Sequence, residues 1–227
     1  MKGFVAAALN AFEVSASTEL ATPLHLALSY DEELGCLGVR SLIDMLAAAP
    51  VRPEMCIVGE PTEMGLATGH KGKTVVRADC TGMAAHSSLA PLAVNAVHLA
   101  CDLVSAIRSR QQSIIETGTH DEAYNIPYTT LHVGRIEGGV QVNIVPQEAS
   151  LEFEIRTLAG DDPAILIEAI TQDIAPVIAA AQKTSPQADI RLTVVNSYPG
   201  LETALDERVV ALLRDLTGVN ATCKVAF

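Results

Sequence analysis

The most constraining feature of the chain is the order of predicted elements between residues 71 and 197. Stretches with the two-residue period of strands alternate with two longer stretches of helical period. The predicted strands are residues 73–80, 129–136, 150–157 and 189–196, and the predicted helices are residues 91–110 and 163–182. The order β-α-β-β-α-β is typical of a ferredoxin-like α+β sandwich, in which one sheet face stays uncovered.

Local patterns support this assignment. In residues 150–157, Leu151, Phe153 and Ile155 alternate with charged residues, which predicts a strand with one buried face. Asp161-Asp162 followed by Pro163 predicts a helix start. The apolar stripe expected on the helix at 91–110 consists of Val94, Val97, Cys101, Val104 and Ile107.

The residues before this segment predict an α/β arrangement. Residues 24–30 and 55–58 are expected to be buried strands, and residues 38–48 the helix that connects them. Such a right-handed crossover would place the two strands side by side and in parallel. Residues 4–12 suit a helix better than a signal peptide, because the apolar run is short and is broken by Asn10. Near the other end, we expect a helix at 206–217 and a strand at 223–227.

Composition excludes several classes of protein. A formal charge of −12 disfavours binding to nucleic acid or to an anionic membrane surface. No apolar run approaches 18 residues, so no transmembrane span is expected. Five scattered cysteines, with no C-x-x-C pair, suit a reducing cytoplasm better than a disulfide framework.

Three carboxylates occupy positions that are typical of metal-binding or catalytic residues. Glu32 and Glu33 follow the first expected strand, and Glu60 follows the second. Both strand ends would lie at the carboxyl edge of the sheet, where α/β proteins bind ligands. A divalent metal would relieve their repulsion, with one carboxylate left to act as a general base. The alternative is a solvated acidic loop and a glutamate at a turn before Pro61.

Three further residues are candidates, each with a structural alternative. His86, in a Gly- and Ser-containing loop, could bind an oxyanion or have no role beyond the loop. Asn143 could bind substrate or satisfy local backbone groups. Arg156 could grip a substrate carboxylate or belong to a surface charge ladder with Glu152 and Glu154.

Six motifs, taken together, resemble one family. They are Ser29-Tyr-Asp-Glu-Glu-Leu-Gly35, Val58-Gly-Glu-Pro-Thr62, His70-Lys-Gly72, Ala85-His-Ser-Ser88, Gly138-Gly139 with Asn143-Ile-Val-Pro146, and Glu154-Ile-Arg156. Their order resembles that in the co-catalytic zinc amidohydrolases, the family of aminoacylases, carboxypeptidases and desuccinylases. Residues 28–33, 59–64 and 196–201 are most similar to family members that act on N2-acetyl-L-ornithine.

The resemblance implies a fold and a domain division. The fold would be a partial zinc-aminopeptidase-like α/β catalytic domain with an inserted ferredoxin-like α+β dimerisation (lid) domain. Residues 1–70 would belong to the catalytic domain, residues 71–197 would form the lid, and residues 198–227 would return to the catalytic domain. A cytoplasmic homodimer formed through the lid domain is implied, with a small N-acetyl amino acid as its substrate.

The resemblance also implies roles. Glu32 would be the general base, while Glu33 and Glu60 would each ligate one of two divalent ions, with zinc or cobalt as the metal. His86 would reach the partner subunit's active site and stabilise the oxyanion. Asn143 and Arg156 would hold polar groups of the substrate. The reaction would be hydrolysis of the acetyl group from N2-acetyl-L-ornithine, giving L-ornithine and acetate for arginine biosynthesis.

Several expectations follow from where the motifs stop. The family's His-x-Asp motif, its bridging Asp before Met1 and its last metal-binding His after Phe227 have no counterpart in the sequence. With Glu33 and Glu60 alone, the chain is expected neither to hold a two-metal site nor to catalyse by itself. Two alternatives remain: a desuccinylase of succinyl-diaminopimelate or another N-acyl-amino-acid deacylase, and a non-catalytic chain that only dimerises.

Overall fold

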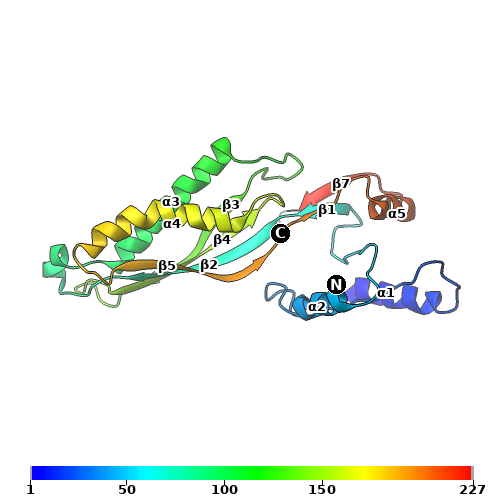
Figure 1. The fold of residues 1–227 in the computed structure, drawn as a ribbon, viewed down its shortest axis with the longest axis horizontal. Coiled ribbons are helices and arrows are strands. Elements are labelled where there is room, and N and C mark those ends of the chain that lie inside the picture. Colours follow the sequence, from blue (N-terminus) through cyan, green and yellow to red (C-terminus); the bar gives the residue numbers. More distant parts are fainter. Residues whose placement is uncertain (1, 226–227) are drawn as a thin grey trace. The chain divides into compact units, whose positions relative to one another are not determined.

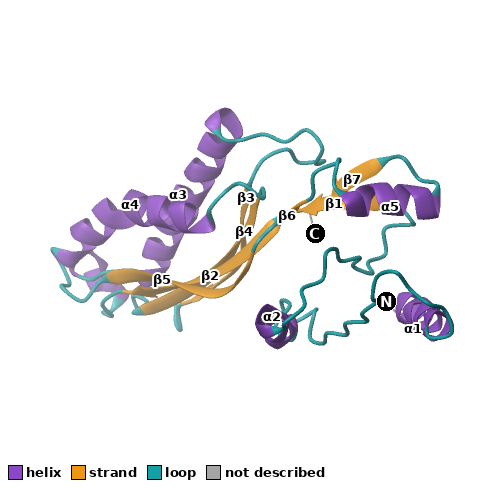
Figure 2. Cartoon of the chain, turned by 45° about the vertical axis from the view of Figure 1, so that its right-hand side comes forward, coloured by secondary structure: helices purple, strands orange, loops and turns teal. Residues whose placement is uncertain are grey.

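The computed structural model describes residues 2–225 and contains a four-stranded and a three-stranded sheet (Figures 1 and 2). The helices are α1 (Lys2–Ser15), α2 (Val39–Ala48), the 3₁₀ helix η1 (Ser87–Leu92), α3 (Ala96–Thr117), α4 (Pro163–Gln182) and α5 (Arg208–Thr217). The strands are β1 (Leu66–His70), β2 (Gly72–Thr81), β3 (Thr130–Gly138), β4 (Glu148–Thr157), β5 (Asp189–Tyr198), β6 (Leu201–Glu202) and β7 (Thr222–Val225). The last two positions of the strand expected at 223–227 lie outside the described residues.

The four-stranded sheet confirms the predicted sandwich. Its strand order is β3-β4-β2-β5, and all neighbouring strands are antiparallel. This is the order that a β-α-β-β-α-β sequence produces in a ferredoxin-like fold. Helices α3 and α4 lie together on one face of the sheet, and the other face is left bare (Figure 1).

Alternation along β4 explains why the core lies on that one face. Leu151, Phe153 and Ile155 are at most 1% exposed, as the sequence predicted. Phe153 is opposite Val76 on β2 and Val133 on β3, so its ring stands in the middle of the sheet. Burying side chains of this size contributes about 1.5–3 kcal/mol each.

Helix α3 differs from its prediction in start and in face. It begins after Asn95, whose Oδ1 accepts hydrogen bonds from the amides of Val97 (2.9 Å) and His98 (3.2 Å). The buried residues are Ala96, Leu99, Ala100, Leu103, Ile107 and Ile114. Cys101, expected in the core, is exposed. The start was predicted too far upstream because Pro91 belongs to the separate helix η1.

Helix α4 has the predicted bounds, and the Asp162 side chain caps it by accepting from the Ala164 amide at 2.8 Å. Among the described helices it is the one long and apolar enough to cross a membrane by length and composition. Core helices of soluble proteins share this length and composition. Here Ile170 and Ile174 are fully buried in the core beneath the helix.

The two strands expected at 24–30 and 55–58 are not formed, which corrects the sequence-based prediction. Both segments lack strand hydrogen bonding, and Leu24, Leu28 and Val58 are exposed. Strand structure needs a neighbouring strand that completes the ladder of backbone hydrogen bonds. The apolar pattern indicates a preference for extended backbone but cannot supply that neighbour. The helix between them, α2, is formed as predicted, and so are α1 and α5.

The chain divides into two compact units. Of the described residues, the first unit comprises 2–68 and 203–223, and the second, which we call the sandwich unit, comprises 69–202 and 224–225. The smaller sheet has the order β6-β1-β7, and in it Gly69 pairs with Glu202. The domain division expected at 70/71 and 197/198 stays a prediction.

Candidate functional site

The segment that carries His86 is held by a second segment nearly sixty residues later in the chain. The amides of Gly82 and Ser87 donate to the carbonyls of Gln147 (2.7 Å) and Asn143 (2.9 Å). Between them, the Val145 amide donates to the Ala85 carbonyl at 2.9 Å. His86 and Ile144 therefore face each other as an isolated antiparallel bridge. The pairing fixes the backbone of His86 although both segments are irregular.

Gly82 allows this arrangement. A Cβ at this position would lie 2.2 Å from the Val94 carbonyl oxygen, so any side chain would push the backbone at Gly82 away from the segment before α3. Met83 and Val94 exchange backbone hydrogen bonds on that side. The His86 segment is thus enclosed by residues 143–147 on one side and by the residues before α3 on the other.

The His86 side chain is exposed and caps helix η1. Its Nδ1 lies 2.8 Å from Ser88 Oγ and accepts from the Ser88 amide at 3.3 Å. Within residues 2–225 the structure records no hydrogen bond to Nε2. The ring is therefore oriented through one nitrogen while the other remains available to a ligand.

Asn143 lies beside His86 in the sandwich unit. Its backbone carbonyl is used in the pairing with Ser87, and its side chain is exposed. Gly139, with φ of +82°, turns the chain at the start of the loop that carries it. The structure thus brings together two of the six predicted site residues by means of backbone hydrogen bonds.

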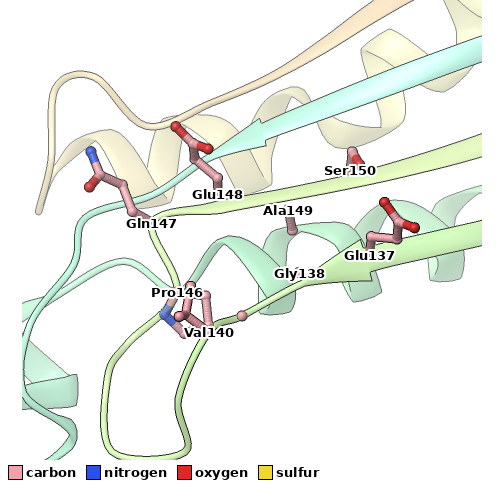
Figure 3. Close-up of a pocket in the computed structure, with 9 residues that line it drawn as sticks. Glu137, Gly138, Val140, Pro146, Gln147, Glu148, Ala149 and Ser150 are labelled. Carbon is pink, nitrogen blue, oxygen red and sulfur yellow. The ribbon is translucent and has the colours of Figure 1, made fainter.

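An open hollow of about 510 Å³ lies at the base of this loop (Figure 3). It is lined by Glu137 to Val140 and by Pro146 to Ser150, which come from the facing ends of β3 and β4. Gly138 is needed there, because a Cβ would lie 2.8 Å from both Ala149 Cβ and Val97 Cγ2. Neither His86 nor Asn143 lines the hollow, so the candidate site and the hollow are separate features.

Arg156 is placed in a charge ladder on the bare face of the sheet. Its Nε donates to Glu154, which also pairs with Lys73 at 3.2 Å. Burial alone would raise the pKa of Glu154, but hydrogen bonds from Arg156 and Lys73, together with their charges, outweigh burial and lower it. The structural alternative named for Arg156 is thus present, and a role in binding substrate stays a prediction.

The three carboxylates lie on exposed turns of the first unit. The Glu32 carbonyl accepts from the amides of Gly35 (3.0 Å) and Cys36 (2.9 Å), which closes a tight turn that includes Glu33. The Glu60 carbonyl accepts from the Thr62 amide at 2.9 Å. All three side chains are exposed.

The three carboxylates are not gathered into a metal-binding group. Among the described residues, no three His, Cys, Asp or Glu side chains are close enough to hold a metal ion. The expected convergence of Glu32, Glu33 and Glu60 is therefore wrong for this structure. Its physical reason is the missing strand pair: without the ladder between 24–30 and 55–58, nothing aligns the two turns at one edge.

Two structural features were not anticipated from the sequence. One is Ser88, which was quoted within a motif but given no role. The other is Lys71, which is 1% exposed, donates to the Tyr128 carbonyl and lies 5.5 Å from the Tyr124 ring centroid. Burial lowers the pKa of Lys71, and Asp161 partly opposes this effect. A histidine two residues before a serine was the available signal for Ser88, whereas no pattern indicated a buried lysine.

Comparison with known proteins identifies the family of this sandwich fold. The family described as the peptidase dimerisation domain of M20 peptidases matches residues 68–181, just over half of the chain. The chain belongs to this family. The match covers β2, α3, β3, β4 and most of α4, so the ferredoxin-like sandwich is the M20 dimerisation domain. The family resemblance identified from the motifs is confirmed.

Curated relatives extend the similarity to both units. The chain is 34% identical over 225 residues to acetylornithine deacetylase of Salmonella heidelberg, which covers 97% of this chain and 55% of the relative. It is 27% identical over 219 residues to acetylornithine deacetylase of Aliivibrio salmonicida, covering 96% and 56%. The chain thus spans about half the length of the curated relatives it matches.

Solved structures confirm the fold class. Aminopeptidase PepT from Bacillus cereus matches with a TM-score of 0.58 and 21% identity, covering 87% of this chain and 48% of that one. A tripeptidase from Staphylococcus aureus matches with a TM-score of 0.58 and 22% identity, covering 88% and 48%. The M20 chain is therefore a mixed α/β protein with a dimerisation domain and part of a zinc-peptidase-like fold.

Proposed function

We propose that this M20 chain is part of a metal-dependent amide hydrolase that removes the acetyl group of N2-acetyl-L-ornithine, giving L-ornithine and acetate for arginine biosynthesis. The observation that carries the proposal is the 34% identity to an acetylornithine deacetylase over nearly the whole chain. The six ordered motifs support the same assignment. The placement of His86 and Asn143 side by side adds a polar site in the dimerisation domain.

His86 is proposed as the residue that stabilises the oxyanion. A hydrogen-bond donor aimed at the developing charge of a tetrahedral intermediate lowers the barrier to amide hydrolysis. The exposed His86 ring has one nitrogen engaged and one open, which suits a donor to a ligand. Asn143 and Arg156 are proposed to hold polar groups of the substrate, and Arg156 would have to exchange its contact with Glu154 to do so.

Two divalent ions, zinc or cobalt, are proposed as cofactors of the complete enzyme, where they would polarise the scissile carbonyl and a bound water. The described residues do not fit such a site, because no three His, Cys, Asp or Glu side chains among them are close enough to hold an ion. We therefore derive no step through the ions. Glu32 is proposed as the general base, as the family resemblance implies.

The test is a substrate panel on the completed chain, by which we mean the chain extended with the segments that the Salmonella heidelberg relative has outside the aligned residues. N2-acetyl-L-ornithine is expected to be hydrolysed fastest. Equal or faster hydrolysis of N-succinyl-diaminopimelate would make the chain a desuccinylase, and hydrolysis of no N-acyl amino acid would overturn the proposal. For the 227-residue chain alone, we expect substoichiometric zinc and no turnover.

A homodimer formed through the sandwich unit and a cytoplasmic location are also proposed. The dimer is supported by the family to which residues 68–181 belong, and the location by five free cysteines. A non-catalytic chain that only dimerises is the second candidate, favoured by the lack of any buried residue in α1 and α2. Light scattering would show a dimer in both cases, and only the substrate panel separates them.

A further inference from the structure

The contacts of His86 determine which ring nitrogen carries its proton. The Ser88 amide N–H can act only as a donor, and it points at His86 Nδ1 over 3.3 Å. Nδ1 must therefore be the lone-pair nitrogen. Ser88 Oγ, 2.8 Å from the same atom, must then donate its hydroxyl proton to Nδ1 as well.

The opposite tautomer would lose the contact with the Ser88 amide and reverse the direction of the contact with the Ser88 hydroxyl. With a proton on Nδ1, the ring N–H would face the Ser88 amide N–H, and two donors would be directed at each other. Ser88 Oγ could accept from the ring, but the cap at the start of η1 would be broken. In neutral histidine one nitrogen donates and the other accepts, so fixing Nδ1 as acceptor places the proton on Nε2.

We infer that Ser88 is a positioning residue that fixes neutral His86 as the Nε2–H tautomer, so that the open side of the ring is always a hydrogen-bond donor. This inference rests on the proposed oxyanion role of His86 and deepens it. The backbone pairing of Ser87 with Asn143 fixes the main chain of His86, and Ser88 fixes its ring. Two adjacent serines thus act on different parts of the site: the Ser87 amide holds the main chain, and the Ser88 amide and hydroxyl hold the ring.

Ser87 provides a matched control for Ser88. Both serines are exposed and lie within two residues of His86, but among the described residues the Ser87 hydroxyl makes no hydrogen bond. Ser87→Ala removes a hydroxyl of the same size from the same turn and keeps the amide that bonds Asn143. Ser88→Thr keeps a hydroxyl at the critical position.

The test is long-range ¹H–¹⁵N correlation NMR of the ring nitrogens in the 227-residue chain, at about pH 8.5, above the ordinary titration range of histidine. His86→Gln identifies the His86 signals among the six histidines. The wild type, Ser87→Ala and Ser88→Thr are expected to show a protonated Nε2 and an unprotonated Nδ1. Ser88→Ala keeps the amide that selects the tautomer and should keep the proton on Nε2. Ser88→Pro also removes the amide N–H and is expected to lower the ratio of Nε2–H to Nδ1–H on the order of fivefold, the effect of one lost hydrogen bond.

The inference is overturned if wild-type His86 carries its proton on Nδ1, if Ser88→Pro leaves the ratio unchanged, or if Ser87→Ala lowers the ratio as much as Ser88→Pro does. The measurement needs no turnover, so it is separate from the substrate panel. If the completed chain had no hydrolase activity, the proposed function would be refuted. The NMR result would still show whether Ser88 fixes the tautomer of His86.

Discussion

The amide of Ser87 donates a hydrogen bond of 2.9 Å to the carbonyl oxygen of Asn143. With the bond from Val145 to Ala85, it joins two irregular segments that both carry predicted site residues. Because the bonds are made by backbone groups, the arrangement depends on the path of the chain more than on the neighbouring side chains.

Amide hydrogen exchange should reveal this pairing. The amides of Ser87 and Val145 are expected to exchange at least about tenfold more slowly than that of Val142, which is fully exposed in the same loop. The measurement is residue-resolved exchange by NMR on the 227-residue chain. Equal rates at the three positions would show that the two segments are not held together in solution.

Glu154→Gln should weaken the charge ladder in a pH-dependent way. Because Arg156 and Lys73 lower the pKa of Glu154, the ionised carboxylate contributes stability that is present above its ordinary pKa of 4.5. That contribution is lost as the pH falls through the lowered value. We expect a loss of about 1 kcal/mol or less at neutral pH, since the pair is partly exposed.

Urea unfolding of wild type and Glu154→Gln at neutral and acidic pH measures this difference. Glu148→Gln is the control, because Glu148 begins the same strand and has no ion pair among the described residues. A difference between wild type and Glu154→Gln that grows in acid would contradict the ladder.

Lys71→Met should change how stability depends on alkaline pH. Burial lowers the pKa of Lys71, so between that value and 10.5 the folded chain holds fewer protons than the unfolded chain. The stability of the wild type should therefore rise with pH relative to Lys71→Met across this window. Denaturant unfolding between neutral pH and about pH 10 tests the sign, with the exposed Lys183→Met as a control. A difference in stability between wild type and Lys71→Met that does not change with pH would show that burial does not lower the pKa of Lys71.

The thiol of Cys80 should be protected in the folded protein. Burial, with Asp79 and Asp189 nearby, raises the pKa of Cys80 to about 11, whereas Cys101 is exposed. A maleimide at about pH 8 should label Cys101 rapidly and Cys80 only after unfolding, because the thiolate is the reactive form. Peptide mass spectrometry with and without urea gives the result. Labelling of Cys80 as fast as Cys101 in the native chain would contradict the packing of β2 in the core.

The elements that could be predicted from the sequence are those whose signals are local. Leu151, Phe153 and Ile155 alternate within one strand, which was predicted with the right end but begins two residues earlier, at Glu148. Asp162 and Pro163 mark the start of α4, which has the predicted bounds. The strand expected at 24–30 was wrong because a strand is completed by a partner elsewhere in the chain.

In the candidate site, too, only the features with local sequence signals could be predicted. His86 and Asn143 could be named from motifs, but their proximity depends on hydrogen bonds between segments far apart in the sequence. The contact between Ser88 and His86 depends on the path of a loop, which periodicity does not describe. Lys71 was missed because lysine is rarely buried, and its burial depends on tertiary packing.

The most direct test of the account is the rate of N2-acetyl-L-ornithine hydrolysis by the completed chain and by its His86→Ala variant. We expect hydrolysis by the completed chain and a fall in kcat of about 10²–10³-fold in the variant, the usual effect of removing an oxyanion donor. His98→Ala, at an exposed histidine on α3, should retain full activity. A completed chain that hydrolyses no N-acyl amino acid, or a His86→Ala variant with undiminished kcat, would contradict the account.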